Sequence, residues 1–164
     1  MGLFRGGKKD KKTQAAERTM AECIRMVEGF FRQVGLDPKN QRLPDQNVVG
    51  WWIVRGSALI YVTLYEGERI ATLRMVSPIL YLPDERIVAL YRRCLELNSE
   101  LLNCALGVFG DRIAVVSERP IVGLDPEELK GTLDYLSAVA DDLDDKLADE
   151  FNARLYGGRR IVGQ

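Results

Sequence analysis

Apolar residues recur at helical spacing in three stretches of the chain. In the first, residues 13–34, the apolar positions form a single stripe, which is typical of a helix packed on one side. Gly35 follows directly and favours a helix end, and Pro38 prevents the helix from resuming. The pattern therefore predicts a first helix over residues 13–34.

Two further helices are predicted later in the chain. The second follows Pro83, with Asp84 expected as its N-cap, and its apolar stripe extends to Leu101. The third begins at Asp125, where an N-cap aspartate, a proline and two glutamates form a strong start signal. Its stripe predicts a helix that continues to about Leu155.

The segments between these helices alternate apolar and polar residues, which is typical of strands. The expected strands cover residues 48–54, 58–66, 69–76, 104–109 and 112–118. Residues 77–82 extend the third strand beyond an expected break at Pro78. Short turns join neighbouring strands, so we expect an antiparallel arrangement. The predicted fold is α+β in the order α-β-β-β-α-β-β-α, with a five-stranded antiparallel sheet and three helices.

The length of 164 residues fits one domain. We expect a basic flexible tail over residues 1–12, one domain over residues 13–156 and a C-terminal tail over residues 157–164. No run of 18 apolar residues is present, and the N-terminus lacks a secretory signal. Three cysteines, an odd number, indicate a reducing compartment. We therefore expect a cytoplasmic protein.

The chain contains no histidine. This excludes Ser-His-Asp and Cys-His nucleophile systems, and it excludes zinc sites that need histidine. Three cysteines are also too few for a four-cysteine zinc site within one chain. We therefore expect no catalytic residues, no metal and no cofactor.

The cysteines allow two interpretations. Cys94 falls on the apolar stripe of the second helix and Cys104 opens a strand, so both are expected as small core residues. The alternative is a small-molecule sensor or an enzyme with a pocket between the second helix and the sheet. Asn98, Glu100, Asn103 and Cys104 would then form its polar lining.

Charge is distributed unevenly along the chain, although the net charge is only −1. Residues 1–12 are basic and residues 125–150 are acidic. We expect the basic tail to promote solubility, with membrane association through the tail as an alternative. We expect no stable nucleic-acid complex, because the chain as a whole is not basic. The acidic stretch is expected to be a solvated helix face, with docking of a basic partner as the alternative.

Aromatic residues supply the main candidate for binding. Adjacent strand residues point to opposite faces, so one of Trp51 and Trp52 belongs to the core and the other to the far face of the sheet. An exposed aromatic face indicates a protein partner or a second copy of the chain, unless a helix covers it. The candidate partner-binding residues are Trp51, Trp52, Tyr61, Tyr65, Phe30 and Phe31.

The order of elements and the second half of the chain resemble a known family. The segment LYRRCLELNSELLNCALGVFGDRIAVVSE begins at Leu90, and its LxLN stretch ends at Asn98 before a hairpin. A helix with the pattern PxxLxxxLxxLxxxADxxxxxL follows over residues 126–147. These features resemble the bacterial YbjN-type proteins, which share the fold of the class I type III secretion chaperones. The resemblance implies a non-enzymatic homodimer, chaperone-like or regulatory, that binds a polypeptide partner.

Overall fold

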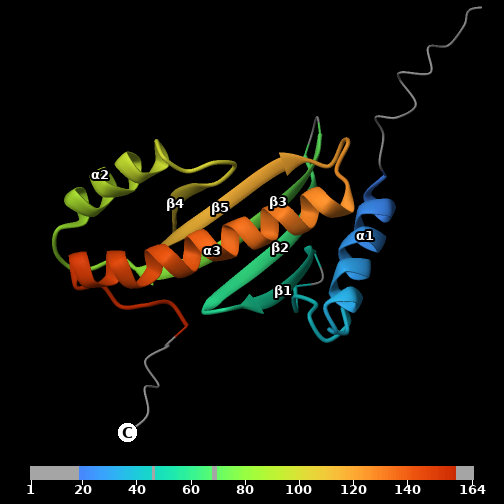
Figure 1. Ribbon diagram of the computed structural model, residues 1–164, viewed down its shortest axis with the longest axis horizontal. Helices are drawn as coiled ribbons and strands as arrows, with labels where there is room; N and C mark the ends of the chain where they lie inside the picture. Colours follow the sequence, from blue (N-terminus) through green and yellow to red (C-terminus); the bar gives the residue numbers. More distant parts are fainter. Residues whose placement is uncertain (1–18, 46, 68–69, 158–164) are drawn as a thin grey trace, which may run out of the picture.

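The computed structural model describes residues 19–45, 47–67 and 70–157. The elements follow the predicted order α-β-β-β-α-β-β-α (Figure 1). They are α1 (Met20–Gln33), β1 (Val49–Arg55), β2 (Ala58–Glu66), β3 (Ala71–Tyr81), α2 (Ile87–Asn98), β4 (Ala105–Phe109), β5 (Arg112–Pro120) and α3 (Pro126–Phe151). The predicted α+β class and the antiparallel five-stranded sheet are confirmed.

The strands lie in the order β1-β2-β3-β5-β4, and every neighbouring pair is antiparallel. Gly56 and Gly110 occupy the hairpin turns with φ of +60° and +62°, a conformation that glycine adopts without steric cost. Helix α3 crosses one face of the sheet (Figure 1). Helix α1 packs at one end of α3, and α2 packs beside the edge strand β4 (Figure 1).

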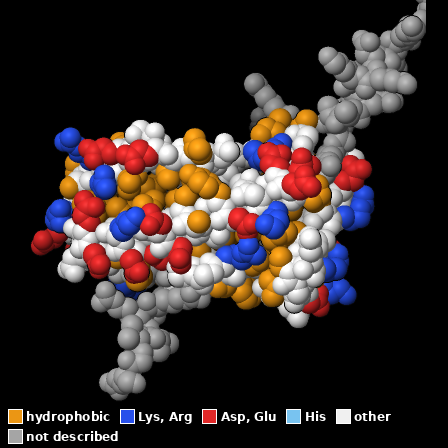
Figure 2. All heavy atoms as spheres, viewed as in Figure 1, with side chains coloured by type: hydrophobic (Ala, Val, Ile, Leu, Met, Phe, Trp, Pro, Cys, Tyr) orange, Lys and Arg blue, Asp and Glu red, His pale blue; other side chains and the backbone are white. Residues whose placement is uncertain are grey.

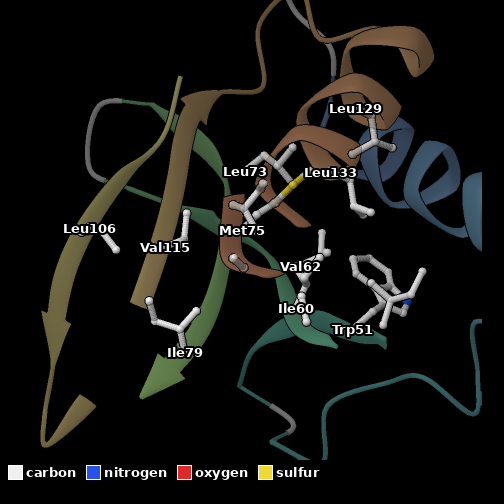
Figure 3. Close-up of a cluster of buried hydrophobic side chains, with 14 of the residues drawn as sticks. Trp51, Ile60, Val62, Leu73, Met75, Ile79, Leu106, Val115, Leu129 and Leu133 are labelled. Carbon is white, nitrogen blue, oxygen red and sulfur yellow. The ribbon is translucent and has the colours of Figure 1, made fainter. Parts of the chain in front are cut away.

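The hydrophobic core lies between α3 and the sheet. From Ala58 to Tyr65 in β2 the burial alternates, so every second side chain points toward the helices. Figure 3 shows side chains of the sheet converging on Leu129 and Leu133 of α3. The sheet residues labelled there are Trp51, Ile60, Val62, Leu73, Met75, Ile79, Leu106 and Val115. All are buried. Because adjacent residues of a strand point to opposite faces, the alternate residues of each strand lie on the other face of the sheet.

Helix α1 begins and ends as its sequence indicates, within the described residues. Thr19 forms a capping box with Glu22, which satisfies backbone N–H groups at the helix start. Gly35 follows the helix with φ of +80°, and the N–H of Leu36 donates to the carbonyl of Phe31 at 2.9 Å. The predicted helical residues 13–18 lie outside the described residues.

The predicted start of the second helix was wrong by two residues. Asp84 lies before α2, and the N-cap is Arg86, which adopts a left-handed conformation and makes no side-chain capping bond. The guanidinium of Arg86 instead donates to the carbonyl of Glu150 at 2.7 Å and covers the ring of Phe151. These contacts with the end of α3 take the place of a capping bond.

The expected break at Pro78 is a bulge inside one continuous strand. β3 extends through this residue to Tyr81, and its register against β5 shifts between Pro78 and Leu80. Proline lacks a backbone N–H, so a bulge lets the strand continue without the missing bond. The shift leaves Tyr81 opposite Arg112 on β5.

Helix α3 starts as predicted and ends earlier than predicted. The side chain of Asp125 accepts from the N–H of Glu128 at 2.8 Å, with Pro126 as the first helical residue. The helix ends at Phe151, because Asn152 adopts φ of +51°. The following segment turns back and pairs with β3 through a bridge between Leu155 and Leu80. The predicted basic tail over residues 1–12 lies outside the described residues, as does the predicted C-terminal tail apart from Gly157.

Candidate functional site

The face of the sheet that α3 leaves open carries one apolar row across all five strands. The cross-strand partners connect Trp52 of β1, Tyr61 of β2, Val76 of β3, Val116 of β5 and Ala105 of β4. We call this set the central row. All of its side chains are half-buried, because neighbours in the row shield each other while the face remains accessible. The row is a continuous apolar strip, and the helices within the described residues pack against the other face of the sheet (Figure 1).

The six candidate aromatic residues divide between the two sides of the sheet. Trp51 has 0% of its surface exposed, and it packs against Phe31 with ring centroids 6.3 Å apart. Phe30 and Phe31 also belong to the core, so these three side chains are not accessible to a partner in this structure. Partner binding therefore remains a prediction, and of the six candidates only Trp52, Tyr61 and Tyr65 are placed to contribute to it. Val76 and Val116 join them, and only the strand register could have revealed this.

At one end of the open face, the charged side chains pair with each other. The guanidinium of Arg74 pairs with Glu118 at 2.6 Å, and the hydroxyl of Tyr65 donates to the same carboxylate. The guanidinium also lies over the ring of Tyr65, 5.2 Å from its centroid. Because both charges are satisfied internally, this end offers a polar boundary without net charge.

The other end carries three tyrosines and two arginines. The hydroxyls of Tyr61 and Tyr156 lie 3.2 Å apart, and the rings of Tyr81 and Tyr156 pack with centroids 5.5 Å apart. Burial, followed by the hydrogen bond with Tyr156, raises the pKa of Tyr61 to about 12. Arg112 lies over the rings of Tyr81 and Tyr156, and Arg154 lies 3.9 Å from the centroid of Tyr81. We call these five residues the arginine–tyrosine cluster.

The outer edges of the sheet are occupied by other parts of the chain. Beside β1, the N–H of Leu43 donates to the carbonyl of Gly50 at 3.0 Å, and the N–H of Trp52 donates to the carbonyl of Gln41 at 2.9 Å. At the other side, the amide of Asn98 bonds both backbone groups of Leu106 in β4. These contacts reduce the backbone available for an added strand and leave the open face as the accessible surface.

The end of β3 is also paired. The N–H of Tyr81 donates to the carbonyl of Arg154 at 2.8 Å, and the N–H of Tyr156 donates to the carbonyl of Ile79 at 2.9 Å. The segment after α3 therefore fixes Arg154 and Tyr156 beside the open face. Nothing in the sequence pattern indicated this pairing, because residues 153–157 were expected to be helical or a tail.

The structure does not bring the alternative pocket residues together. The side chain of Asn98 is used by β4, as described above. Glu100 lines a groove between α2 and α3, whereas Asn103 lines a separate cavity beside the end of β5. Cys94 is 6% exposed, and burial raises its pKa to about 11. Burial also raises the pKa of Cys104, so neither thiol is activated as a nucleophile.

The groove between α2 and α3 has a volume of about 350 Å³. Figure 2 shows this side of the molecule, with apolar side chains gathered between the two helices. Its floor includes Leu97, Leu101, Val139 and Leu143, and charged residues of both signs form its rim. The groove lies between two helices and not between α2 and the sheet, where the alternative pocket was expected.

The acidic face of α3 is engaged with the β1–β2 turn. The side chain of Asp141 accepts from both the hydroxyl and the N–H of Ser57, and the hydroxyl also donates to Asp144 at 3.2 Å. Burial is the main reason that the pKa of Asp144 is raised. Within residues 19–45, 47–67 and 70–157, no cluster of three or more acidic, histidine or cysteine side chains could hold a metal ion.

Exposed apolar side chains also occur on α2, on the segment that follows it and on β4. Val88 and Leu95 of α2 are 82% and 70% exposed, and they share one helix face because they are seven residues apart. Leu102 is 70% exposed and Val108 of β4 is 49% exposed. We call these four residues the α2–β4 patch. Large apolar side chains this exposed are typical of an interaction surface when they cluster.

The described helices include none that is long and apolar enough to cross a membrane. Helices on one face of a five-stranded antiparallel sheet define an α+β protein with the fold of the type III secretion chaperones. The chain belongs to the family described as T3SS (YopN, CesT) and YbjN peptide-binding chaperone 1, which matches residues 24–162. The family resemblance and the absence of enzymatic activity predicted from the sequence are thereby confirmed.

Two solved structures are similar to this chain at the level of the fold. One is the crystal structure of the ExsC–ExsE complex, with a TM-score of 0.61, 15% identity and coverage of 80% of this chain and 97% of the other. The second is the HopA1–SchA chaperone–effector complex, with a TM-score of 0.54, 15% identity and coverage of 79% and 99%. No curated protein matches this chain in sequence.

Proposed function

We propose that this chain is a chaperone that holds an extended segment of a client polypeptide against the open face of its sheet. The central row is the observation that carries the proposal. It places Trp52 and Tyr61 beside aliphatic side chains in a strip that crosses every strand. An apolar, partly exposed strip with aromatic members is the kind of surface that binds other proteins.

The size of the face fits a short peptide segment. Five strands at a spacing of about 4.8 Å give a strip about 19 Å wide. An extended chain advances about 3.4 Å per residue, so about six client residues would cross the strip. Apolar client side chains would contact the central row on alternate positions. The contacts are between side chains, so they would select clients by the apolar residues at these alternate positions.

The occupied edges favour this mode over strand addition. Strand addition requires free backbone N–H and carbonyl groups along an edge. Gln41 and Leu43 use such groups on β1, and Asn98 uses those of Leu106 on β4. Of the two structures similar in fold, one is described as a chaperone–effector complex and the other as a complex of ExsC with ExsE. This similarity supports a polypeptide as the client.

We further propose that the protein acts as a homodimer joined through the α2–β4 patch. A two-fold interface must be complementary to itself. The patch is compatible with this condition, because Arg92 and Glu96 beside Leu95 pair with each other and leave no net charge to repel a second copy. Burying Val88 and Leu95 against a second copy would remove the two most exposed large apolar side chains of α2 from water.

We place this activity in the cytoplasm, as the sequence predicted. Cys23, Cys94 and Cys104 are all free thiols, which supports a reducing compartment. The basic residues 1–12 are proposed to promote solubility, with membrane association through them as the alternative to be tested by deletion. Binding that disappears at high salt would indicate an electrostatic role for the tail.

Photo-crosslinking tests client binding directly. A crosslinking amino acid at position 76 on the open face is expected to capture a client in cells of the native host. The same amino acid at position 138, an exposed position on α3, serves as the control. Trp52→Glu is expected to abolish capture from position 76, whereas Ala138→Glu leaves it unchanged. Capture that is equal from both positions and insensitive to Trp52→Glu contradicts the proposal.

A further inference from the structure

The arginine–tyrosine cluster combines parts of the chain that are far apart in sequence. Arg112 starts β5 and pairs across the sheet with Tyr81 of β3 and Phe109 of β4. Arg154 and Tyr156 come from the segment after α3, which pairs with the end of β3. The cluster therefore lies at the end of the open face and is held by the backbone of three strands and the C-terminal segment.

Both guanidiniums are positioned by aromatic rings. Arg112 lies 5.6 Å from the ring centroid of Tyr81 and 5.2 Å from that of Tyr156. Arg154 lies 3.9 Å from the ring centroid of Tyr81. Contact with a ring face restricts a guanidinium while its N–H groups remain available at the edge. Two such groups on one ring form an organised set of donors.

The charge of the cluster is not neutralised. Among the described residues, Arg154 has no carboxylate partner. Arg112 has only Asp111, whose Oδ1 lies 3.3 Å from its Nε, and this buried Nε makes no hydrogen bond. The hydroxyls of Tyr61, Tyr81 and Tyr156 are the other titratable groups of the cluster. The cluster thus has two positive charges against one exposed carboxylate, whereas Arg74 at the opposite end is paired.

We propose that the arginine–tyrosine cluster binds a carboxylate side chain of the client, an aspartate or a glutamate next to its apolar segment. This inference rests on the proposed function and adds the chemistry of the client. Guanidiniums bind carboxylates through short, charge-assisted hydrogen bonds, often two at a time. A carboxylate placed here would satisfy the free donors of Arg112 and Arg154 and face the ring of Tyr81.

The geometry also sets the position of the acidic residue. Val116 of the central row and Arg112 both lie on β5, four residues apart. The spacing of strand residues separates them by about 13 Å. An extended client that leaves the central row at Val116 and continues toward Arg112 would therefore carry its acidic residue about four positions beyond the side chain that contacts Val116. The client motif is an apolar segment with an acidic residue at one end.

Selection from a random peptide display library tests the motif. The wild-type protein, the double variant Arg112→Gln with Arg154→Gln, and Trp52→Glu would be used as targets. We expect wild-type selections to enrich apolar residues together with Asp or Glu at a fixed offset. The double variant is expected to keep the apolar enrichment and lose the acidic residue, and Trp52→Glu is expected to lose the apolar enrichment.

A matched pair of peptides makes the test independent of the variants' folding. A selected peptide and its copy with Glu replaced by Gln would be titrated against the wild-type protein. Loss of a charged hydrogen-bond partner predicts binding weaker by about tenfold or more for the Gln peptide. Equal affinity, or selected peptides without acidic enrichment, overturns the inference and leaves the proposed function intact. A wild-type protein that enriches no peptide at all overturns both.

Discussion

The side-chain amide of Asn98 makes two hydrogen bonds with the backbone of Leu106. It donates to the carbonyl at 3.1 Å and accepts from the N–H at 2.6 Å. Asn98 is the last residue of α2 and Leu106 lies in the edge strand β4. A side chain thus substitutes for the neighbouring strand that β4 lacks, and this bond pair attaches the end of α2 to the sheet.

Replacing Asn98 by alanine is expected to destabilise the fold. The change leaves the N–H and carbonyl of Leu106 without their partners in a partly buried site, which costs about 1–3 kcal/mol. Urea denaturation would measure the free energy of unfolding. Glu100→Ala, two residues away and exposed, is the control and should change it by less than about 0.5 kcal/mol. Equal effects of the two changes would mean that the bond pair contributes nothing.

The sequence placed Asn98 correctly, at the end of an LxLN stretch before a hairpin, but did not indicate what its side chain bonds. The partner, Leu106, lies eight residues further on in a strand. The sequence pattern could not identify Leu106 as the partner, because the position of α2 beside β4 depends on tertiary packing.

Adjacent tryptophans predict contrasting effects. Trp51 is fully buried against Phe31, and Trp51→Ala is expected to cost about 3–5 kcal/mol through lost burial and a cavity. Trp52 is half-buried on the open face, and Trp52→Ala is expected to cost about 1 kcal/mol. Comparing the midpoints of urea unfolding of the two variants tests this prediction. A larger loss for Trp52 would contradict the assignment of faces.

The sequence could predict that Trp51 and Trp52 point to opposite sides, but not which one enters the core. That choice depends on where α1 lies, because Phe31 packs on Trp51. The strand periodicity predicted the antiparallel sheet well, since alternation is a local property. The arginine–tyrosine cluster was not predictable, because Arg112 and Arg154 meet only after the end of α3 pairs with β3.

Cys94 is expected to be unreactive in the native protein. Burial holds the pKa of its thiol at about 11, so little thiolate exists at neutral pH. Labelling with a thiol reagent in the native state should be slower than in urea by a factor of about ten or more, since exposure and thiolate formation both require opening. The single-cysteine protein that retains Cys94 allows this measurement. Rapid native labelling would instead support a thiol site.

Alkaline pH is expected to weaken the fold through Cys94 and Tyr61. Burial raises the pKa of Cys94 from 9.0 to about 11, and burial with Tyr156 raises that of Tyr61 from 10.0 to about 12. The unfolded chain therefore loses these protons at lower pH than the folded chain. Their stabilisation is complete below pH 9 and is lost progressively between pH 9 and 12.

Thermal unfolding at pH 8 to 11 would measure this dependence. The double variant Cys94→Ala with Tyr61→Phe is expected to show a shallower fall in melting temperature above pH 9 than the wild-type protein. Tyr135→Phe is the control, because Tyr135 is 38% exposed on α3 and away from both groups. Parallel curves for the wild type and the double variant would show that other groups control alkaline unfolding.

The α2–β4 patch predicts a specific change in oligomeric state. Leu95 is 70% exposed in a monomer, so Leu95→Glu should hardly alter the free energy of unfolding of one chain. In a dimer the same change would bury two glutamates in an apolar contact, one from each copy, which is strongly unfavourable. Light scattering at micromolar concentration should therefore report a dimer for the wild type and a monomer for Leu95→Glu. Ala138→Glu, with the same added charge on α3, should remain a dimer, and a monomeric wild type would refute the proposed interface.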